Sequence, residues 1–115
     1  MVNAKKKGNA GEHAFSHWLM SHGIKAFRNS MSGGSVWKGD IANNLDMTIE
    51  VKTVKKINLL EAWTQVNKDA SVAHNSPVLA IRFDHMPKDE WLVVMHSEDW
   101  VEMVKKYKGI PDVDN

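Results

Sequence analysis

The chain of 115 residues contains no cysteine, which excludes disulfide scaffolds, thiolate zinc sites and cysteine nucleophiles. It also lacks a long apolar run. The longest stretches free of Asp, Glu, Lys and Arg cover residues 13–24 and 70–81, well short of the ~20 apolar residues that cross a bilayer. The basic run at 5–7 precedes Gly8 rather than an apolar segment, so it predicts no signal peptide. We expect one cytoplasmic domain over residues 1–115.

The net charge of +1 hides an uneven distribution. Residues 1–60 hold nine Lys and Arg against four acids, a net +5, whereas residues 61–115 hold six against ten, a net −4. A basic half can present a positive face to a polyanion such as a nucleic acid. Such asymmetry is also common in proteins without a polyanionic partner, so the placement of the four acids has to decide between these interpretations.

Capping residues and apolar periodicity predict eight elements. The expected caps are Asn9 with Glu12, Asn58 with Glu61, and Ser97–Asp99. The elements are a helix at 10–22, strands at 24–29, 39–43 and 47–54, a helix at 58–72, strands at 78–83 and 91–95, and a helix from 97 that Gly109 ends. Residues 30–35 are predicted to form a loop. The order α-β-β-β-α-β-β-α predicts a small α/β sheet with helices packed against it.

Two carboxylates face each other across the predicted hairpin. Strand alternation puts Glu50 and Lys52 on one face of the strand at 47–54. If the hairpin turns about residue 45, Asp40 lies opposite Glu50 at about 5 Å, whereas a register shifted by one residue sends it to the other face. Two carboxylates so placed repel each other. A bound divalent cation makes this arrangement of the two carboxylates favourable, because Mg²⁺ requires hard oxygen ligands that converge on one point.

Glu12 is the third acid of the basic half with a candidate role, since it borders the apolar stripe of the first helix. Its local role would be to form a capping box with Asn9, and this role is compatible with a second role in a metal site. For Glu50 and Lys52, the structural alternative is an exposed edge strand blunted by charges. Asp46 lies in the turn and needs no chemical role. A metal site would explain the other three acids together.

The segments Gly39-Asp40 and Glu50-Val51-Lys52 resemble the PD-(D/E)XK nuclease signature, with Gly39 in place of the signature proline. The order of elements resembles the restriction-endonuclease-like α-β-β-β-α-β core of that superfamily, with an added strand and a C-terminal helix. The segment Lys6–Glu12, the strand with Arg28 and the Ser/Gly loop resemble the archaeal-type Holliday junction resolvases. The resemblance covers roughly residues 5–83.

The resemblance implies a Mg²⁺-dependent endodeoxyribonuclease of a prokaryotic, archaeal or phage-infected cell, for which Mn²⁺ can replace Mg²⁺. Its substrate would be branched DNA, the four-way junction above all. By this resemblance Asp40, Glu50 and Glu12 bind the metal and Lys52 orients the attacking water. Gln65 takes the place of a glutamine that related nucleases often carry near the site.

DNA contacts are expected from the basic residues and from the loop before Asp40. The expected DNA-binding residues are Lys5, Lys6, Lys7, Arg28, Ser32, Ser35, Trp37, Lys38, Lys55 and Lys56. Among them, Trp37 could stack on a base. Two alternatives stay open: another nuclease of the same fold that acts on duplex, nicked or flap DNA, and an inactive DNA-binding module.

Cutting a four-way junction needs two symmetric nicks, and the chain has one candidate site, so a resolvase would be a homodimer. The candidate interface comprises the strand Trp91–Met95 and the third helix, with Trp100, Met103, Val104 and Tyr107. The alternative is that these residues close the core of the monomer. A zinc site at His13 and His17 is disfavoured, because no third ligand is evident.

Overall fold

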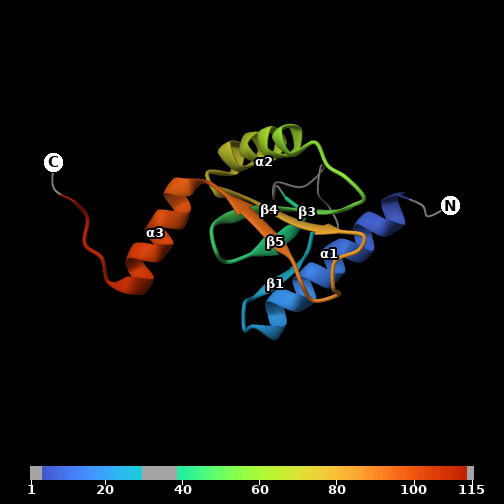
Figure 1. The fold of residues 1–115 in the computed structure, drawn as a ribbon, viewed down its shortest axis with the longest axis horizontal. Coiled ribbons are helices and arrows are strands. Elements are labelled where there is room, and N and C mark those ends of the chain that lie inside the picture. Colours follow the sequence, from blue (N-terminus) through green and yellow to red (C-terminus); the bar gives the residue numbers. More distant parts are fainter. Residues whose placement is uncertain (1–3, 30–38, 114–115) are drawn as a thin grey trace.

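The computed structural model describes residues 4–29 and 39–113, with side chains from residue 8 onward. Its eight elements follow the predicted order (Figure 1). They are α1 (Ala4–Ser21), β1 (Ala26–Arg28), β2 (Ile41–Asn43), β3 (Met47–Val54), α2 (Leu59–Ala73), β4 (Ser76–Phe83), β5 (Leu92–Met95) and α3 (Ser97–Lys108). The predicted α/β fold with a C-terminal helix is confirmed. Within the described part of the chain, no helix combines the length and the apolar character needed to cross a bilayer.

The five strands form one mixed sheet in the order β1-β2-β3-β4-β5. β3 and β4 run parallel and are joined through α2, whereas the other neighbouring pairs are antiparallel. In the β2–β3 hairpin, Ile41 pairs with Ile49. This is the predicted register, in which the chain turns about residue 45 and Asp40 approaches Glu50.

Helices α1 and α2 cover opposite faces of the sheet (Figure 1). On one face, Phe15 of α1 packs with Ile41 and Ile49. On the other face, Val66 of α2 packs with Leu79, and both are fully buried. Burying an aliphatic side chain of this size contributes about 1.5 to 3 kcal/mol. Side chains of β3 and β4 point alternately to the two faces of the sheet, so these strands hold both α1 and α2 in place.

The first helix begins at Ala4 rather than at residue 10, and the prediction that Asn9 caps it is wrong. Alanine and lysine, which occupy positions 4–7, favour helix and extend it towards the N-terminus. Inside α1, the Asn9 Oδ1 atom instead accepts a hydrogen bond from Arg28 Nη2 of β1 at 2.8 Å. The Asn9 side chain, which the local sequence pattern assigned to a helix cap, therefore binds a residue that is distant in the sequence.

The other predicted element ends differ in smaller ways. β1 covers only Ala26–Arg28, because its partner strand β2 is equally short. The cap of α2 is confirmed, since the Glu61 N–H donates to Asn58 Oδ1 at 3.1 Å. The cap predicted for α3 at Ser97–Asp99 is wrong. Here the N-cap is His96, which makes no side-chain capping bond among the described residues.

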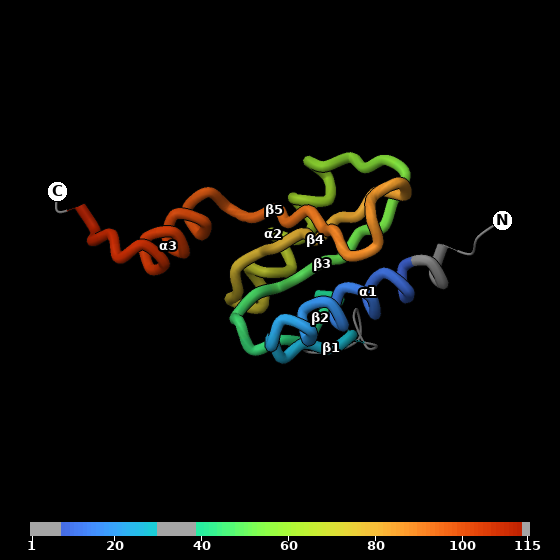
Figure 2. Tube along the Cα trace, turned by 60° about the horizontal axis from the view of Figure 1, so that its bottom comes forward, coloured from blue at the N-terminus to red at the C-terminus, as the bar shows by residue number. Residues whose placement is uncertain are grey.

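Helix α3 projects from the sheet and lies at one end of the molecule, whose extents are 56 × 32 × 29 Å (Figure 2). None of its residues is buried, and its side chains Trp100, Met103 and Tyr107 are 57%, 51% and 83% exposed. The alternative that these residues close the core of the monomer is therefore wrong for α3. It is confirmed for the strand before it, because Trp91 and Met95 pack against the core. The sheet is already covered by α1 and α2.

Candidate active site

Asp40 is held by the backbone on both sides of it. Its N–H donates to Ile49 O and its own carbonyl accepts from Asn29 N–H, both at 2.8 Å. Its side-chain Oδ2 accepts from Val51 N–H, also at 2.8 Å. The carboxylate thus satisfies a β3 donor at the point where β2 begins, and these three bonds fix its position.

The backbone just before Asp40 explains why residue 39 is glycine and not the proline of the signature that this segment resembles. Gly39 has φ +103°, in the region that L-residues rarely adopt. Proline is restricted to a φ of about −65° and cannot take this conformation. A Cβ at Gly39 would also lie 3.1 Å from the carbonyl oxygen of Ile49. The local path of the chain therefore accounts for glycine at this position.

Glu50 is the second carboxylate, on the face of β3 that α2 covers. Burial, the charge of Asp40 and a hydrogen bond with Asp40 together raise its pKa to about 8, and burial is the largest of these causes. Lys52, two residues along the strand, acts in the opposite direction. The predicted hairpin register therefore brings Asp40, Glu50 and Lys52 together as the sequence indicated.

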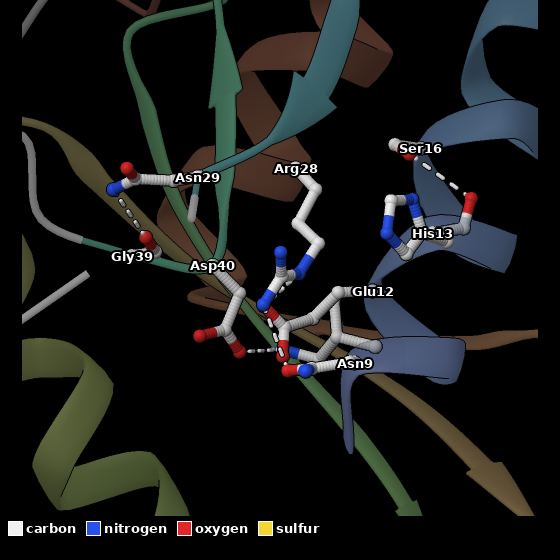
Figure 3. A network of polar contacts seen from close by, with 9 residues as sticks. Asn9, Glu12, His13, Ser16, Arg28, Asn29, Gly39 and Asp40 are labelled. Carbon is white, nitrogen blue, oxygen red and sulfur yellow. Dashed lines mark hydrogen bonds and ion pairs between the residues drawn. The ribbon is translucent and has the colours of Figure 1, made fainter. Parts of the chain in front are cut away.

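Glu12 lies on the other side of Asp40 and is paired with Arg28 (Figure 3). Arg28 Nε is 3.5 Å from Glu12 Oε1, and Arg28 Nη2 donates to Asn9. The pKa of Glu12 is raised by burial and by the charge of Asp40, while Arg28 opposes the rise. Asp40 therefore stands between two carboxylates, one from α1 and one from β3.

The close approach of α1 to the sheet depends on Gly11. A Cβ at this position would lie 2.6 Å from Thr53 Cγ2 of β3, a distance that real side chains essentially never show. Without a side chain at residue 11, the helix can lie directly on β3. Glu12 follows immediately, so this contact sets how near its carboxylate comes to Asp40.

Asp69 of α2 is a site residue that the sequence analysis missed. Its charge raises the pKa of Glu50, so α2 adds a further acid to the site. Gln65, four residues earlier, donates from Nε2 to Asp69 Oδ1 at 3.3 Å. The signal in the sequence was this i, i+4 spacing, which places the two side chains next to each other on the helix. Gln65 itself is exposed and shares a shallow hollow with Lys52.

A solved structure shares this arrangement of strands and helices. The chain is similar to the structure of Hjc, a Holliday junction resolvase from an archaeal hyperthermophile, Archaeoglobus fulgidus, with a TM-score of 0.55. The two are 21% identical, and the match covers 77% of this chain and 72% of that chain. This is a resolvase-like fold. No protein-family model matches the chain, and no curated protein matches it.

The structure describes the side chains of only some of the predicted DNA-binding residues. Arg28 is half-buried beside Glu12, whereas Lys55 and Lys56 are exposed directly after β3. Lys5, Lys6 and Lys7 lie in the first turns of α1, but their side chains fall outside the described part of the chain. Ser32, Ser35, Trp37 and Lys38 also lie outside the described residues.

The donor set at Asp40 and Glu50 fits a hard divalent cation. Both side chains offer carboxylate oxygens, and their mutual repulsion is the cost that a bound cation removes. Within residues 4–29 and 39–113, no three His, Asp or Glu side chains are close enough together to hold an ion as a group. The structure therefore brings two of the predicted ligands together, and it pairs the third, Glu12, with Arg28.

Proposed function

We propose that this protein is a metal-dependent endonuclease of the PD-(D/E)XK type that cuts branched DNA, and specifically a Holliday junction resolvase. The observation that carries the proposal is the pair of neighbouring carboxylates at Asp40 and Glu50, with Lys52 on the same face of β3. The fold shared with an archaeal Holliday junction resolvase supports this choice of substrate. We expect the protein to act on this DNA in the cytoplasm.

Asp40 and Glu50 would hold Mg²⁺, or Mn²⁺ in its place, which supplies positive charge to the phosphodiester and lowers the pKa of water. Asp40 is suited to this role because its position is fixed by backbone bonds. Glu12 supports the site from α1, in an orientation set by Arg28.

Lys52 is exposed and carries its ammonium group beside Glu50, where it can orient the attacking water and offset the phosphate charge. Gln65 and Asp69 lie on the α2 side of the same site and would order water there. Attack on phosphorus and breakage of its bond to the 3′ oxygen would leave a 5′-phosphate and a 3′-hydroxyl. Lys55 and Lys56 would bind the DNA backbone without reading its sequence.

A resolvase must make two symmetric cuts, and each chain offers one site. We therefore propose a C2 homodimer in which both sites face the same junction. The exposed helix α3 and the edge strand β5 are the available surface, since both keep apolar side chains exposed outside the core.

The proposed function is tested by cleavage of a synthetic four-way junction, compared with a linear duplex of the same sequence and with nicked and flap DNA. Cleavage should require Mg²⁺ and should be fastest on the junction. Asp40→Asn and Glu50→Gln should each abolish cleavage and retain junction binding. Asp89→Asn and Glu90→Gln, at exposed positions before β5, are matched controls that should cut normally.

Each other outcome points to one of the alternatives. Equal cutting of junction, duplex and flap DNA would favour a nuclease of the same fold with a different substrate. Junction binding without cleavage in any divalent cation would favour a DNA-binding module. Normal cutting by Asp40→Asn or Glu50→Gln would refute the proposed site.

A further inference from the structure

The edge strand β1 carries an exposed aromatic side chain on the face of the sheet that bears the candidate active site. Phe27 is 67% exposed, whereas its neighbours face α1: Ala26 is buried in the core, and Arg28 is paired with an acid of that helix. Strand alternation therefore turns Phe27 away from α1, towards the face on which Glu50 lies. On that face, the described core residues that pack with α2 include none from β1 or β2.

The strand register sets how far Phe27 lies from the candidate active site. Phe27 pairs with Ala42 of β2, and Asp40 stands two residues before Ala42. Asp40 is thus the diagonal neighbour of Phe27, about 7 to 8 Å away between Cα atoms. On the far side of Asp40, Glu50 shares a hydrogen bond with it. Because a DNA strand rises about 3.4 Å per nucleotide, a strand cut at these carboxylates has a base about two nucleotides away that can reach Phe27.

An open hollow of about 460 Å³, which we call the β1 hollow, lies between the end of α1 and the outer edge of β1. Its larger lining side chains are Met20, Ile24, Lys25 and Phe27. Met20 is 55% exposed, so two large apolar side chains of this hollow are open to water. The volume lies in the range of small-molecule sites. Lys25 is exposed and adds a cation to the apolar lining.

The stretch of sequence that forms the β1 hollow carries no negative charge. Residues 13–39 contain no Asp or Glu but include Lys25, Arg28 and Lys38, a net +3. Such a segment attracts a polyanion. A nucleobase has an apolar face and hangs from an anionic backbone, so it matches both the apolar lining and the charge. The short distance to Asp40 favours DNA over a protein partner as the source of that base.

We infer that the β1 hollow binds an unstacked base of the DNA strand being cut, with the base stacked on the Phe27 ring. A base inside a continuous duplex must first leave both of its stacking neighbours. A base at a branch point has already lost part of that stacking, so it enters the hollow at a lower cost. Phe27 thereby favours branched DNA over linear duplex. This role rests on the proposed function, because it places the cut strand at Asp40 and Glu50.

The first test measures DNA binding by the full chain, with a chelator present so that no strand is cut. The probes are a synthetic four-way junction, a forked DNA with unpaired bases at its branch point, and a linear duplex. Phe27→Ala and Phe27→Leu should each bind the two branched DNAs about 10-fold more weakly than the wild type, and the duplex within about twofold of it. Phe27→Trp should bind like the wild type, because tryptophan keeps an aromatic plane whereas leucine keeps only apolar bulk.

A double-mutant cycle between protein and DNA identifies the base that is bound. A series of junctions is made in which one nucleotide near the branch point is abasic. At the position that meets Phe27, loss of the base should weaken wild-type binding about 10-fold and leave binding by Phe27→Ala unchanged. Val72→Ala, at an exposed position near the end of α2, is the control and should behave like the wild type throughout. Circular dichroism should show native folding in every variant.

Several results would overturn this role of Phe27. Wild-type affinity of Phe27→Ala for both branched DNAs would show that the ring contacts no base, and weakened self-association of that variant would assign the hollow to a second copy of the chain. Equal losses on branched and duplex DNA would exclude selection of branched DNA. Wild-type binding by Phe27→Leu, or additive losses at every abasic position, would exclude stacking.

These outcomes are separable from failure of the nuclease proposal. A chain that binds branched DNA through Phe27 but cuts none refutes the nuclease and leaves the base-binding hollow intact. Normal selective cutting of junctions by Phe27→Ala refutes the hollow alone. A chain that binds none of the three DNAs refutes both.

Discussion

Glu50 is expected to make the metal-free protein less stable as the pH rises from about 4.5 to about 8. Its pKa in the folded state is raised from the ordinary 4.5 to about 8, chiefly by burial and by Asp40. Below pH 4.5 the carboxyl group is protonated in both the folded and the unfolded chain. Between pH 4.5 and 8 only the unfolded chain releases the proton, so the free energy of unfolding falls through this window and levels off above it.

The size of the loss follows from the two pKa values. A pKa difference of one unit corresponds to about 1.4 kcal/mol, so the shift from 4.5 to about 8 corresponds to about 3 to 5 kcal/mol across the window. Whole domains are stable by only about 5 to 15 kcal/mol, so the loss would be visible in a simple unfolding experiment. Glu50→Gln removes the titrating group, and this variant should be about 3 kcal/mol more stable than the wild type at pH 7.5.

The measurement is urea unfolding followed by tryptophan fluorescence at pH 4.5, 6 and 8, with a chelator present. Wild type and Glu50→Gln should agree at the lowest pH and diverge as it rises, while Glu90→Gln, an exposed control, should follow the wild type. Added Mg²⁺ should restore stability to the wild type and much less to Glu50→Gln. Parallel pH profiles for wild type and Glu50→Gln would refute the reasoning.

Three other predictions concern the site and its approach. Lys52→Ala should lose cleavage yet bind Mg²⁺ with unchanged affinity in calorimetry, and weakened binding would contradict the role given to this lysine. Neutralising the lysines at 5–7 should lower the salt dependence of DNA binding by up to ~2.7 units of slope, and an unchanged slope would mean that they do not touch DNA. Gly39→Ala should destabilise the fold by about 2 to 4 kcal/mol, against about 1 for Gly23→Ala. Both glycines have positive φ, but only at Gly39 does the added Cβ meet backbone atoms, so equal losses in thermal unfolding would refute this comparison.

Local signals in the sequence determined most of the fold. The cap of α2 at Asn58 needs only residues one helical turn apart, and it forms as predicted. The hairpin register follows from strand alternation and the position of the turn, and the pair Ile41–Ile49 confirms it. The approach of Asp40 to Glu50 was predictable for the same reason, because both residues lie within one hairpin.

What the sequence could not determine depends on contacts between distant segments. Asn9 has the pattern of a cap, but Arg28 of β1 reaches it across the fold and α1 continues past it. The exposure of α3 depends on how much of the sheet α1 and α2 already cover, which a helical stripe does not reveal.

The electrostatics of the site were decided by the tertiary structure as well. Asp69 acts on Glu50 only because α2 crosses over β3, and the pairing of Glu12 with Arg28 needs α1 beside β1. Sequence spacing fixes which side chains share a face of one element. Burial and the distance between charges on different elements arise only when those elements pack, and both quantities set the pKa of Glu50.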